Sequence, residues 1–224
     1  MRKITYLIAF LAFAVSIPNF CPAQEIKIVD KPITYDSTRI KLTLQYLKER
    51  HGINQKTVNI EPKMVVLHWT ASKTMISAFN TFNKPTLDGG RTAIAGASNL
   101  NVSSQFLIDR DGTIYRLMPE DIFARHVIGL NYCAIGVENV GSNDFPLTEA
   151  QLHANEQLVR YLCKKYPISY LIGHYEYSLF KGTSLWKETN PNYQTVKTDP
   201  GIDFMQHIRN NLKDLELSGA PPKK

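Results

Sequence analysis

Two short apolar runs, each followed by a histidine, constrain the fold of this chain more than any other feature. Residues 64–67 lead directly into His68, and residues 170–173 lead into His174. Short apolar runs of this kind are typical of buried β-strands, and a side chain at the end of a strand is held on a rigid scaffold. A third polar side chain, Asp199, lies in the segment Lys-Thr-Asp-Pro-Gly. We therefore expect these three side chains to point into one cleft.

Two imidazoles and one carboxylate are the protein ligands of many catalytic zinc sites, in which water takes the fourth position. His68, His174 and Asp199 form such a set, so we expect them to bind one Zn2+ per chain. A chain that brings them together is expected to be a zinc hydrolase. Each residue alone has a simpler explanation: a histidine at a sheet edge, or an aspartate that favours a helix N-terminus.

Glu138 and Lys197 are the expected catalytic residues. Glu138 shares one face of a predicted strand with Ala134 and Gly136, which indicates a face kept open for a partner. A carboxylate beside a zinc site can act as general base. Lys197 lies two residues before Asp199, so in an extended segment both point to one side, where a cation stabilises a developing oxyanion. A solvated glutamate and a surface lysine are the alternatives.

His126 is the ambiguous histidine. It could be a rival third ligand, a substrate contact or an ordinary loop residue. We favour substrate contact, because Asp199 is accompanied by Lys197 and is the better third ligand. His126, Arg125 and Trp69 are the expected substrate-binding residues.

The first 23 residues are expected to be a secretory signal. Arg2 and Lys3 precede an apolar stretch that is short for a membrane span, and small residues follow it. An uncleaved N-terminal anchor and lipid attachment at Cys21 are the alternatives. We expect an exported protein, periplasmic or secreted, with no integral membrane span in its mature form.

The chain after this segment has a mild positive charge, with 24 basic and 20 acidic residues. The basic residues are scattered and do not alternate with aromatic ones, so no nucleic-acid binding is expected. An anionic polymer such as a cell wall is compatible with this charge. Two cysteines remain, Cys133 and Cys163, and export would allow their oxidation. A disulfide and two buried thiols are both open.

The order of predicted elements indicates an α/β fold, with a central mixed β-sheet flanked by helices. An Asp-Gly turn predicts a hairpin around Gly112, and Thr148 with Gln151 predicts a capping box at the start of a helix. A strand is predicted over residues 132–140, and a long loop over residues 83–103.

Three segments are expected after the signal. Residues 24–59 form an N-terminal extension with one helix, residues 60–217 form the main domain, and residues 218–224 form a disordered tail. Within the main domain, residues 175–196 are an insertion without clear periodicity.

Five segments, taken in order, resemble the zinc-dependent N-acetylmuramoyl-L-alanine amidases of the type-2 family, relatives of the peptidoglycan recognition proteins and the amidase-type phage lysozymes. The resemblance covers about residues 60–210, and it implies a central mixed sheet, flanking helices and a groove that holds one zinc. The segments are residues 65–70, 106–115, 134–138, 172–174 and 197–201.

The resemblance also implies roles for individual residues. His68, His174 and Asp199 match the family's zinc ligands, Glu138 matches its catalytic glutamate, and Lys197 matches its catalytic lysine.

One further position in the groove matches the family, and three differ from its relatives. His126 matches a groove histidine, and Arg125 stands where many relatives carry tryptophan. Gln105 stands where many relatives carry histidine, and Ser104 aligns with a tyrosine of the phage enzymes.

The implied activity is hydrolysis of the amide between the lactyl group of N-acetylmuramic acid and L-alanine of a stem peptide. The partner is then peptidoglycan or a muropeptide, and we expect a monomer. A non-catalytic peptidoglycan-binding module of the same fold is the competing expectation. A zinc peptidase is a third, although the chain has no His-Glu-x-x-His segment.

Overall fold

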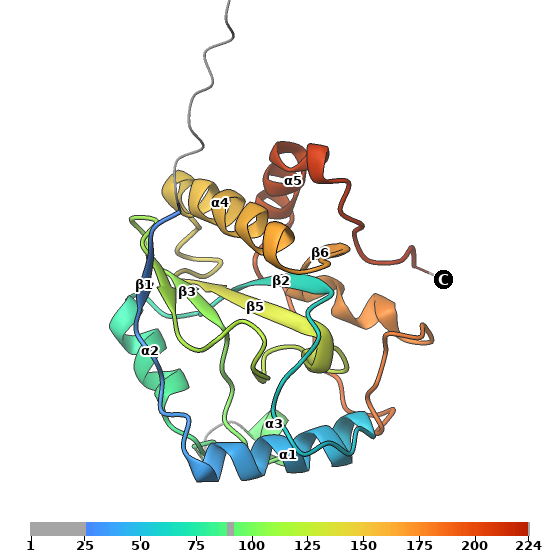
Figure 1. Cartoon of the computed structure of the whole chain (residues 1–224). Coiled ribbons are helices and arrows are strands. Elements are labelled where there is room, and N and C mark those ends of the chain that lie inside the picture. The colour runs from blue at the N-terminus through green and yellow to red at the C-terminus, as the bar shows by residue number, and fades with distance from the viewer. Residues whose placement is uncertain (1–25, 89–91, 224) are drawn as a thin grey trace, which may run out of the picture.

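A six-stranded mixed sheet lies at the centre of the molecule, with helices on both of its faces (Figure 1). The structure is a computed structural model, and it describes residues 26–88 and 92–223. The expected signal at 1–23, including Cys21, lies outside the described residues, as do positions 89–91 of the expected long loop. The predicted α/β class, with a central mixed sheet flanked by helices, is confirmed.

The strands are joined in the order β1-β4-β3-β5-β2-β6. β3, β5, β2 and β6 run parallel to one another, whereas β4 runs antiparallel to β3 and β1 pairs parallel with β4. The β3–β4 pair is the predicted hairpin, and the Gly112 N–H bonds to the Asp109 carbonyl at 3.0 Å in its turn. The strand bounds are Ile28–Asp30 (β1), Met64–Trp69 (β2), Phe106–Ile108 (β3), Ile114–Arg116 (β4), Ala134–Asn139 (β5) and Tyr170–Gly173 (β6).

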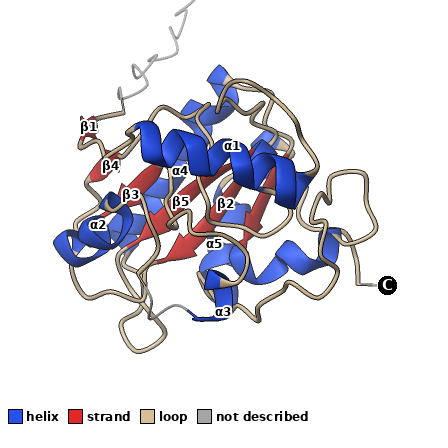
Figure 2. Cartoon of the chain, turned by 90° about the horizontal axis from the view of Figure 1, so that it is seen from below, coloured by secondary structure: helices blue, strands red, loops and turns tan. Residues whose placement is uncertain are grey.

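The helices cover the sheet from opposite sides. α4 and α5 lie over one face and α1 lies over the other, which is the side viewed in Figure 2. No helix in the part of the chain that the structure describes is long and apolar enough to cross a membrane. The helix bounds are Ser37–His51 (α1), Met75–Asn83 (α2), Thr92–Ala95 (α3), Glu149–Lys165 (α4) and Ile202–Asn211 (α5), with short 3-10 helices at Asn131–Cys133 (η1), His174–Phe180 (η2) and Lys213–Leu215 (η3).

Packing on both faces explains why β2 is apolar over most of its length. Val65 and Leu67 pack on the face that α4 and α5 cover, whereas Val66 packs in a separate cluster on the other face. A strand that is covered on both sides has a nearly continuous apolar sequence. Each fully buried side chain of this size contributes about 1.5–3 kcal/mol to stability, so the core fixes where the carboxyl end of β2 lies.

Local signals set the ends of the helices. α1 begins after Asp36, whose carboxylate accepts the Arg39 N–H at 2.9 Å. It ends at Gly52, whose left-handed backbone favours glycine. The predicted capping box is confirmed at the start of α4, where Thr148 and Gln151 each accept the other's backbone N–H.

The two described cysteines are free thiols, so the structure contains no Cys133–Cys163 disulfide. β5 begins later than predicted because Asn131–Cys133 form η1, which takes Cys133 out of the alternating strand. The Cys133 thiol donates to the Leu130 carbonyl at 3.5 Å, and burial raises its pKa to about 11. Cys163 packs instead against the core beneath α4.

Both ends of the described chain extend the fold beyond the predicted boundaries. β1, within the expected N-terminal extension, adds a strand beside β4. Ser218 accepts the Leu171 N–H at 3.0 Å and donates to the Ser169 carbonyl at 2.9 Å. The segment predicted as a disordered tail therefore begins with a paired residue, because Ser218 satisfies backbone groups along the edge strand β6.

The insertion at 175–196 holds the C-terminal end of α1. Arg50 of α1 and Glu188 of the insertion form an ion pair at 2.6 Å. The buried His51 ring lies with its Nδ1 3.0 Å from the Lys187 carbonyl, to which it donates. The N-terminal extension and the insertion are thus in direct contact on the α1 side of the sheet, and these contacts stabilise both segments.

Lowering the pH is expected to destabilise the protein through His51. Burial lowers the pKa of this imidazole to about 4 in the folded protein, against about 6.5 in an unfolded chain. The stabilisation is therefore complete above about pH 6.5 and is lost as the pH falls through 4, by about 3 kcal/mol in total. Urea unfolding of the metal-free wild type and of His51→Asn at pH 7 and pH 4 measures this contribution, because asparagine still donates to Lys187 but does not titrate.

We expect the acid-induced loss of unfolding free energy to be about 3 kcal/mol smaller in His51→Asn than in the wild type. The His153→Asn variant is the matched control, because the His153 side chain is exposed. Equal losses in the wild type and His51→Asn would contradict the role given to His51.

Candidate metal centre

The register of three parallel strands brings Glu138, His68 and His174 side by side. His68 on β2 lies opposite Glu138 on β5, and Leu67 lies opposite Gly173, the last residue of β6. His174 follows β6 directly, so it emerges next to His68. In open sheets with parallel strands, ligands bind beyond the carboxyl ends of the strands, and these three side chains occupy that edge.

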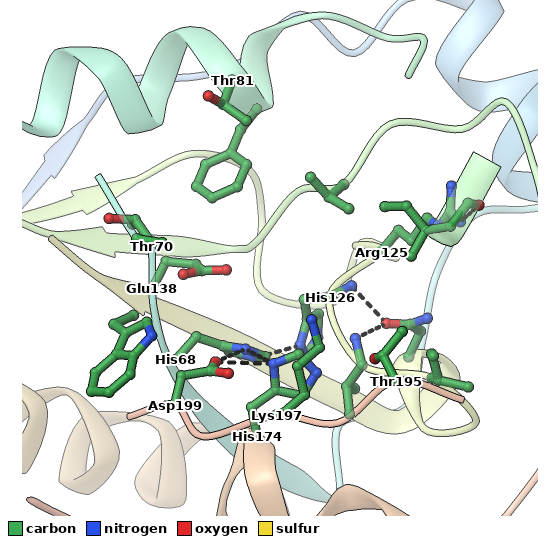
Figure 3. A pocket seen from close by; sticks show the side chains of 18 of the residues that line it. His68, Thr70, Thr81, Arg125, His126, Glu138, His174, Thr195, Lys197 and Asp199 are labelled. Carbon is green, nitrogen blue, oxygen red and sulfur yellow. Dashed lines mark hydrogen bonds and ion pairs between the residues drawn. The ribbon is translucent and has the colours of Figure 1, made fainter. Parts of the chain in front are cut away.

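Asp199 reaches the same point from the segment before α5. Its backbone carbonyl accepts the Tyr175 N–H at 3.1 Å, which ties this segment to η2. Its Oδ2 lies 3.2 Å from His68 Nδ1 and 3.0 Å from His174 Nδ1, and the two nitrogens lie 2.9 Å apart (Figure 3). The structure therefore brings together the three side chains predicted to bind a metal, and all three are buried.

The spacing of these three atoms fits one zinc ion. Zinc lies about 2.0–2.2 Å from histidine nitrogens and carboxylate oxygens, so two ligands of a tetrahedral site are about 3.3 Å apart. The separations of 2.9, 3.0 and 3.2 Å are close to that value. Three protein ligands leave a fourth position for water or substrate.

The charge states of His174 and Asp199 also suit a cation. Burial lowers the pKa of His174 to about 4, and the neighbouring His68 adds to this effect. Burial alone would raise the pKa of Asp199, but the two imidazoles outweigh it and hold that pKa below its usual range. At neutral pH His174 is therefore neutral and Asp199 is ionised, which is the protonation that metal binding requires.

A cleft of about 360 Å3 opens beside these groups, within the size range of small-ligand sites. Glu138 and Lys197 both line it and are partly exposed. Lys197 and Asp199 border the same cleft, as expected for positions two apart in an extended segment. Trp69 also lines the cleft and is partly exposed. The cleft therefore combines a metal-ligand set with one carboxylate and one ammonium group.

His126 lies at the nitrogen of His68 that faces away from Asp199. Its Nδ1 is 3.0 Å from His68 Nε2, and burial lowers its pKa well below the usual value. Its ring rests on Gly136, where an added Cβ would lie 2.8 Å from the imidazole. The open strand face predicted beside Glu138 is thus partly filled by this ring.

Arg125 is buried, and all the hydrogen bonds found for its guanidinium are to other residues of the protein. The guanidinium carbon also lies 5.2 Å from the centre of the Tyr46 ring on α1. These contacts join the loop before β3, the insertion and the N-terminal extension into one wall of the cleft. The guanidinium donates to the carbonyl oxygens of Ile94, Ser98 and Leu100 and to the hydroxyl of Tyr193.

A set of buried amides, whose role the sequence did not reveal, holds the strands of the site. Asn139 Nδ2 donates to the His68 carbonyl at 3.1 Å, and Asn155 of α4 donates to Asn139 at 2.7 Å. Gln105 Oε1 accepts the Gly136 N–H at 2.7 Å. The available signal was a polar residue within an otherwise apolar strand or helix face, because buried polar groups require hydrogen-bond partners.

Comparison with known proteins agrees with this geometry. The sequence profile of the N-acetylmuramoyl-L-alanine amidase family matches residues 58–202. The chain belongs to this family. The matched segment contains every residue of the candidate metal centre, and membership of the amidase family supports amidase activity on peptidoglycan.

Solved structures resemble this amidase-family protein. The N-acetylmuramoyl-L-alanine amidase LysC from Clostridium intestinale URNW is 23% identical, with a TM-score of 0.52, and the match covers 86% of this chain and 99% of LysC. A Se-Met AmpD derivative is 25% identical, with a TM-score of 0.48, and covers 67% of this chain and 84% of its own. Peptidoglycan recognition protein-LE, solved in complex with tracheal cytotoxin, is 16% identical, with a TM-score of 0.48, over 76% of this chain and 95% of its own.

The match to LysC shows that the two proteins share a fold. None of the curated protein sequences compared matches this chain significantly. The chemistry of this amidase-family protein is therefore argued from its own residues.

Replacing Arg125 with glutamine is expected to lower the free energy of unfolding by about 2–4 kcal/mol, because buried carbonyl groups lose their donors. Urea unfolding measures this change. The matched control is Arg160→Gln: Arg160 pairs with Asp214 at the exposed surface, and such pairs contribute less than about 1 kcal/mol. Unchanged stability with a raised KM for muropeptide would show instead that Arg125 is a substrate contact.

Proposed function

We propose that this protein is a zinc-dependent N-acetylmuramoyl-L-alanine amidase. It hydrolyses the amide between the lactyl group of N-acetylmuramic acid and L-alanine of a stem peptide. The observation that best supports the proposal is the convergence of His68 Nδ1, His174 Nδ1 and Asp199 Oδ2 within 3.2 Å of one another. Family membership supports the substrate class, which is peptidoglycan or a muropeptide derived from it.

The residues around the ligand set have complementary roles in this reaction. Bound zinc supplies Lewis-acid activation of the amide carbonyl and of a water molecule. Glu138 accepts a proton from the attacking water and delivers it to the nitrogen of the departing L-alanine. The Lys197 ammonium stabilises the negative charge that develops on the carbonyl oxygen.

A peptidoglycan-binding module without catalysis is the alternative for this fold. A complete metal-ligand set with a carboxylate and an ammonium group on one cleft supports the enzyme, because binding alone requires no such set. Of the expected substrate contacts, Trp69 is partly exposed, whereas Arg125 and His126 are 3% and 9% exposed. Trp69 is therefore the residue of that group best placed to meet a substrate.

Replacing Glu138 with glutamine is expected to lower kcat by about 100- to 10,000-fold, because the general base is lost while its shape is kept. Zinc content, measured by inductively coupled plasma mass spectrometry, should stay at that of the wild type, whereas Asp199→Ala should lose zinc. Mass spectrometry of peptides released from a defined muropeptide measures turnover. Glu149→Gln, at an exposed site on α4, is the matched control.

The outcomes separate the two functions. Wild-type protein that binds zinc and muropeptide but releases no peptide would support the binding module. Full turnover by Glu138→Gln would contradict its assignment as base.

We also propose that the protein is exported and that residues 1–23 are removed. The basic start, the short apolar stretch and the small residues before position 24 support this proposal. N-terminal sequencing of the protein recovered from fractionated bacterial cells should give a chain that begins at Gln24, outside the cytoplasm. An intact N-terminus in the membrane fraction would indicate an anchor instead, and an acylated Cys21 would indicate a lipoprotein.

A further inference from the structure

We propose that His126 is a positioning residue, which holds His68 in the tautomer and orientation that direct its Nδ1 towards the metal. The inference rests on the proposed function, because it concerns the same zinc site. It assigns His126 neither the role of a ligand nor that of a substrate contact. The hydrogen-bonded chain that carries it runs from the Ala134 carbonyl through His126 to His68.

The distances along this chain are those of ordinary hydrogen bonds. His126 Nε2 lies 3.2 Å from the Ala134 carbonyl oxygen, and His126 Nδ1 lies 3.0 Å from His68 Nε2. The two rings are nearly perpendicular, at 86°, with their centres 5.1 Å apart. At the other end of the chain, His68 Nδ1 lies 2.9 Å from His174 Nδ1 and 3.2 Å from Asp199.

The positions of the protons follow from what each atom can do. A carbonyl oxygen only accepts, so His126 Nε2 carries a proton and donates it to Ala134. A neutral imidazole has a single N–H, so His126 Nδ1 is an acceptor and His68 Nε2 must be the donor. An imidazole with its one proton on Nε2 has its lone pair on Nδ1, which in His68 is the atom that faces His174 and Asp199. The hydrogen bond to the far nitrogen thus selects the metal-binding nitrogen, as the acceptors behind metal-bound histidines generally do.

The His126 ring occupies a space that Gly136 leaves free. An added Cβ at Gly136 would come within 2.9 Å of three of its ring atoms, so the ring uses space that only glycine leaves free. Asn131 Oδ1 accepts the backbone N–H groups of His126 and Val127 at 2.8 and 2.7 Å. Gln105 Oε1 accepts the Gly136 N–H at 2.7 Å, which fixes the backbone beneath the ring. These contacts hold the ring against His68 independently of any bound substrate.

The other roles for His126 fit this geometry less well. As a third ligand, it would have to meet the metal near Asp199, but its Nδ1 faces the nitrogen of His68 on the opposite side of that ring. As a substrate contact, it would need a free polar atom, but both ring nitrogens have partners and the residue is only 9% exposed.

Three substitutions at position 126 separate these roles. His126→Asn places an amide oxygen near the former Nδ1 and keeps an acceptor for His68. His126→Gln places an amide near the former Nε2 and keeps only the bond to Ala134. His126→Phe keeps a ring without polar atoms. Zinc affinity of the metal-free proteins is measured by competition with a chromophoric chelator, after thermal unfolding has shown that each variant is folded.

We expect zinc affinity to fall about 10- to 100-fold in His126→Gln and His126→Phe, which is the usual effect of removing the hydrogen-bond acceptor behind a metal-bound histidine. His126→Asn should stay within a few-fold of the wild type. Gly136→Ala should weaken zinc binding by a similar factor to His126→Phe, because it displaces the ring without removing a polar group. Gly96→Ala and His153→Asn are the matched controls, since a Cβ at Gly96 meets nothing within 4 Å and the His153 side chain is exposed.

Nitrogen-15 NMR of the zinc-free wild type tests the same chain without any substitution at the site. We expect both His68 and His126 to carry their proton on Nε2. A His68 with its proton on Nδ1 would overturn the inference, even if the variants did not fold.

Different results would contradict the positioning role and the proposed function. Wild-type protein that binds no zinc would contradict the proposed function. Equal zinc affinity in the wild type and in His126→Phe would overturn the positioning role. A raised KM of His126→Phe at that unchanged zinc affinity would make His126 a substrate contact. Loss of zinc from His126→Asn as severe as from His126→Phe would also overturn it, because retaining the acceptor would then have no effect.

Discussion

The candidate metal centre depends on the register between β5, β2 and β6. Parallel strands end at the same edge of a sheet, so Glu138, His68 and His174 emerge together from three neighbouring strands. A slip of β2 by one residue would turn His68 to the other face, among the apolar side chains beneath α4 and α5. The apolar residues that alternate with His68 oppose that slip, since Val65 and Leu67 are fully buried. The packing of the core and the placement of the ligands are therefore a single constraint.

Contacts outside the sheet complete the site. Asp199 comes from a separate segment, which η2 holds through the Tyr175 N–H. Asn155 of α4 bonds to Asn139, which in turn bonds to the His68 carbonyl. The cleft wall is formed differently, since Arg125 joins three segments that are far apart in the sequence. The ligands are thus fixed by strands and buried amides, and the wall is fixed by one buried guanidinium.

Much of the fold could be predicted because its signals are local. The Asp-Gly turn at Gly112 gives the hairpin, the capping box at Thr148 gives the start of α4, and the runs before His68 and His174 give the central strands. β1 could not be predicted, because a strand of three residues shows no periodicity of its own and exists only through pairing with β4. Whether Cys133 forms a disulfide also could not be predicted, because a 3-10 helix replaces the expected start of the strand.

Some features of the candidate site could also be predicted from the sequence, whereas others could not. The sequence identified His68, His174, Asp199, Glu138 and Lys197, and the structure places all five around one cleft. It did not locate the His126 ring, because that depends on the space above Gly136, which lies on another element. It also gave no reason to expect the Arg125 guanidinium to be occupied by backbone carbonyls.

The sequence by itself determined which donor atoms are available and on which kinds of element they lie, because periodicity, caps and turns are properties of neighbouring residues. Only the tertiary structure decided that two imidazoles and a carboxylate meet within 3.2 Å and that His68 presents Nδ1 to the other two. The physical reason is that such meetings depend on packing between segments distant in the chain, and no local pattern specifies which nitrogen of an imidazole its neighbours will leave free.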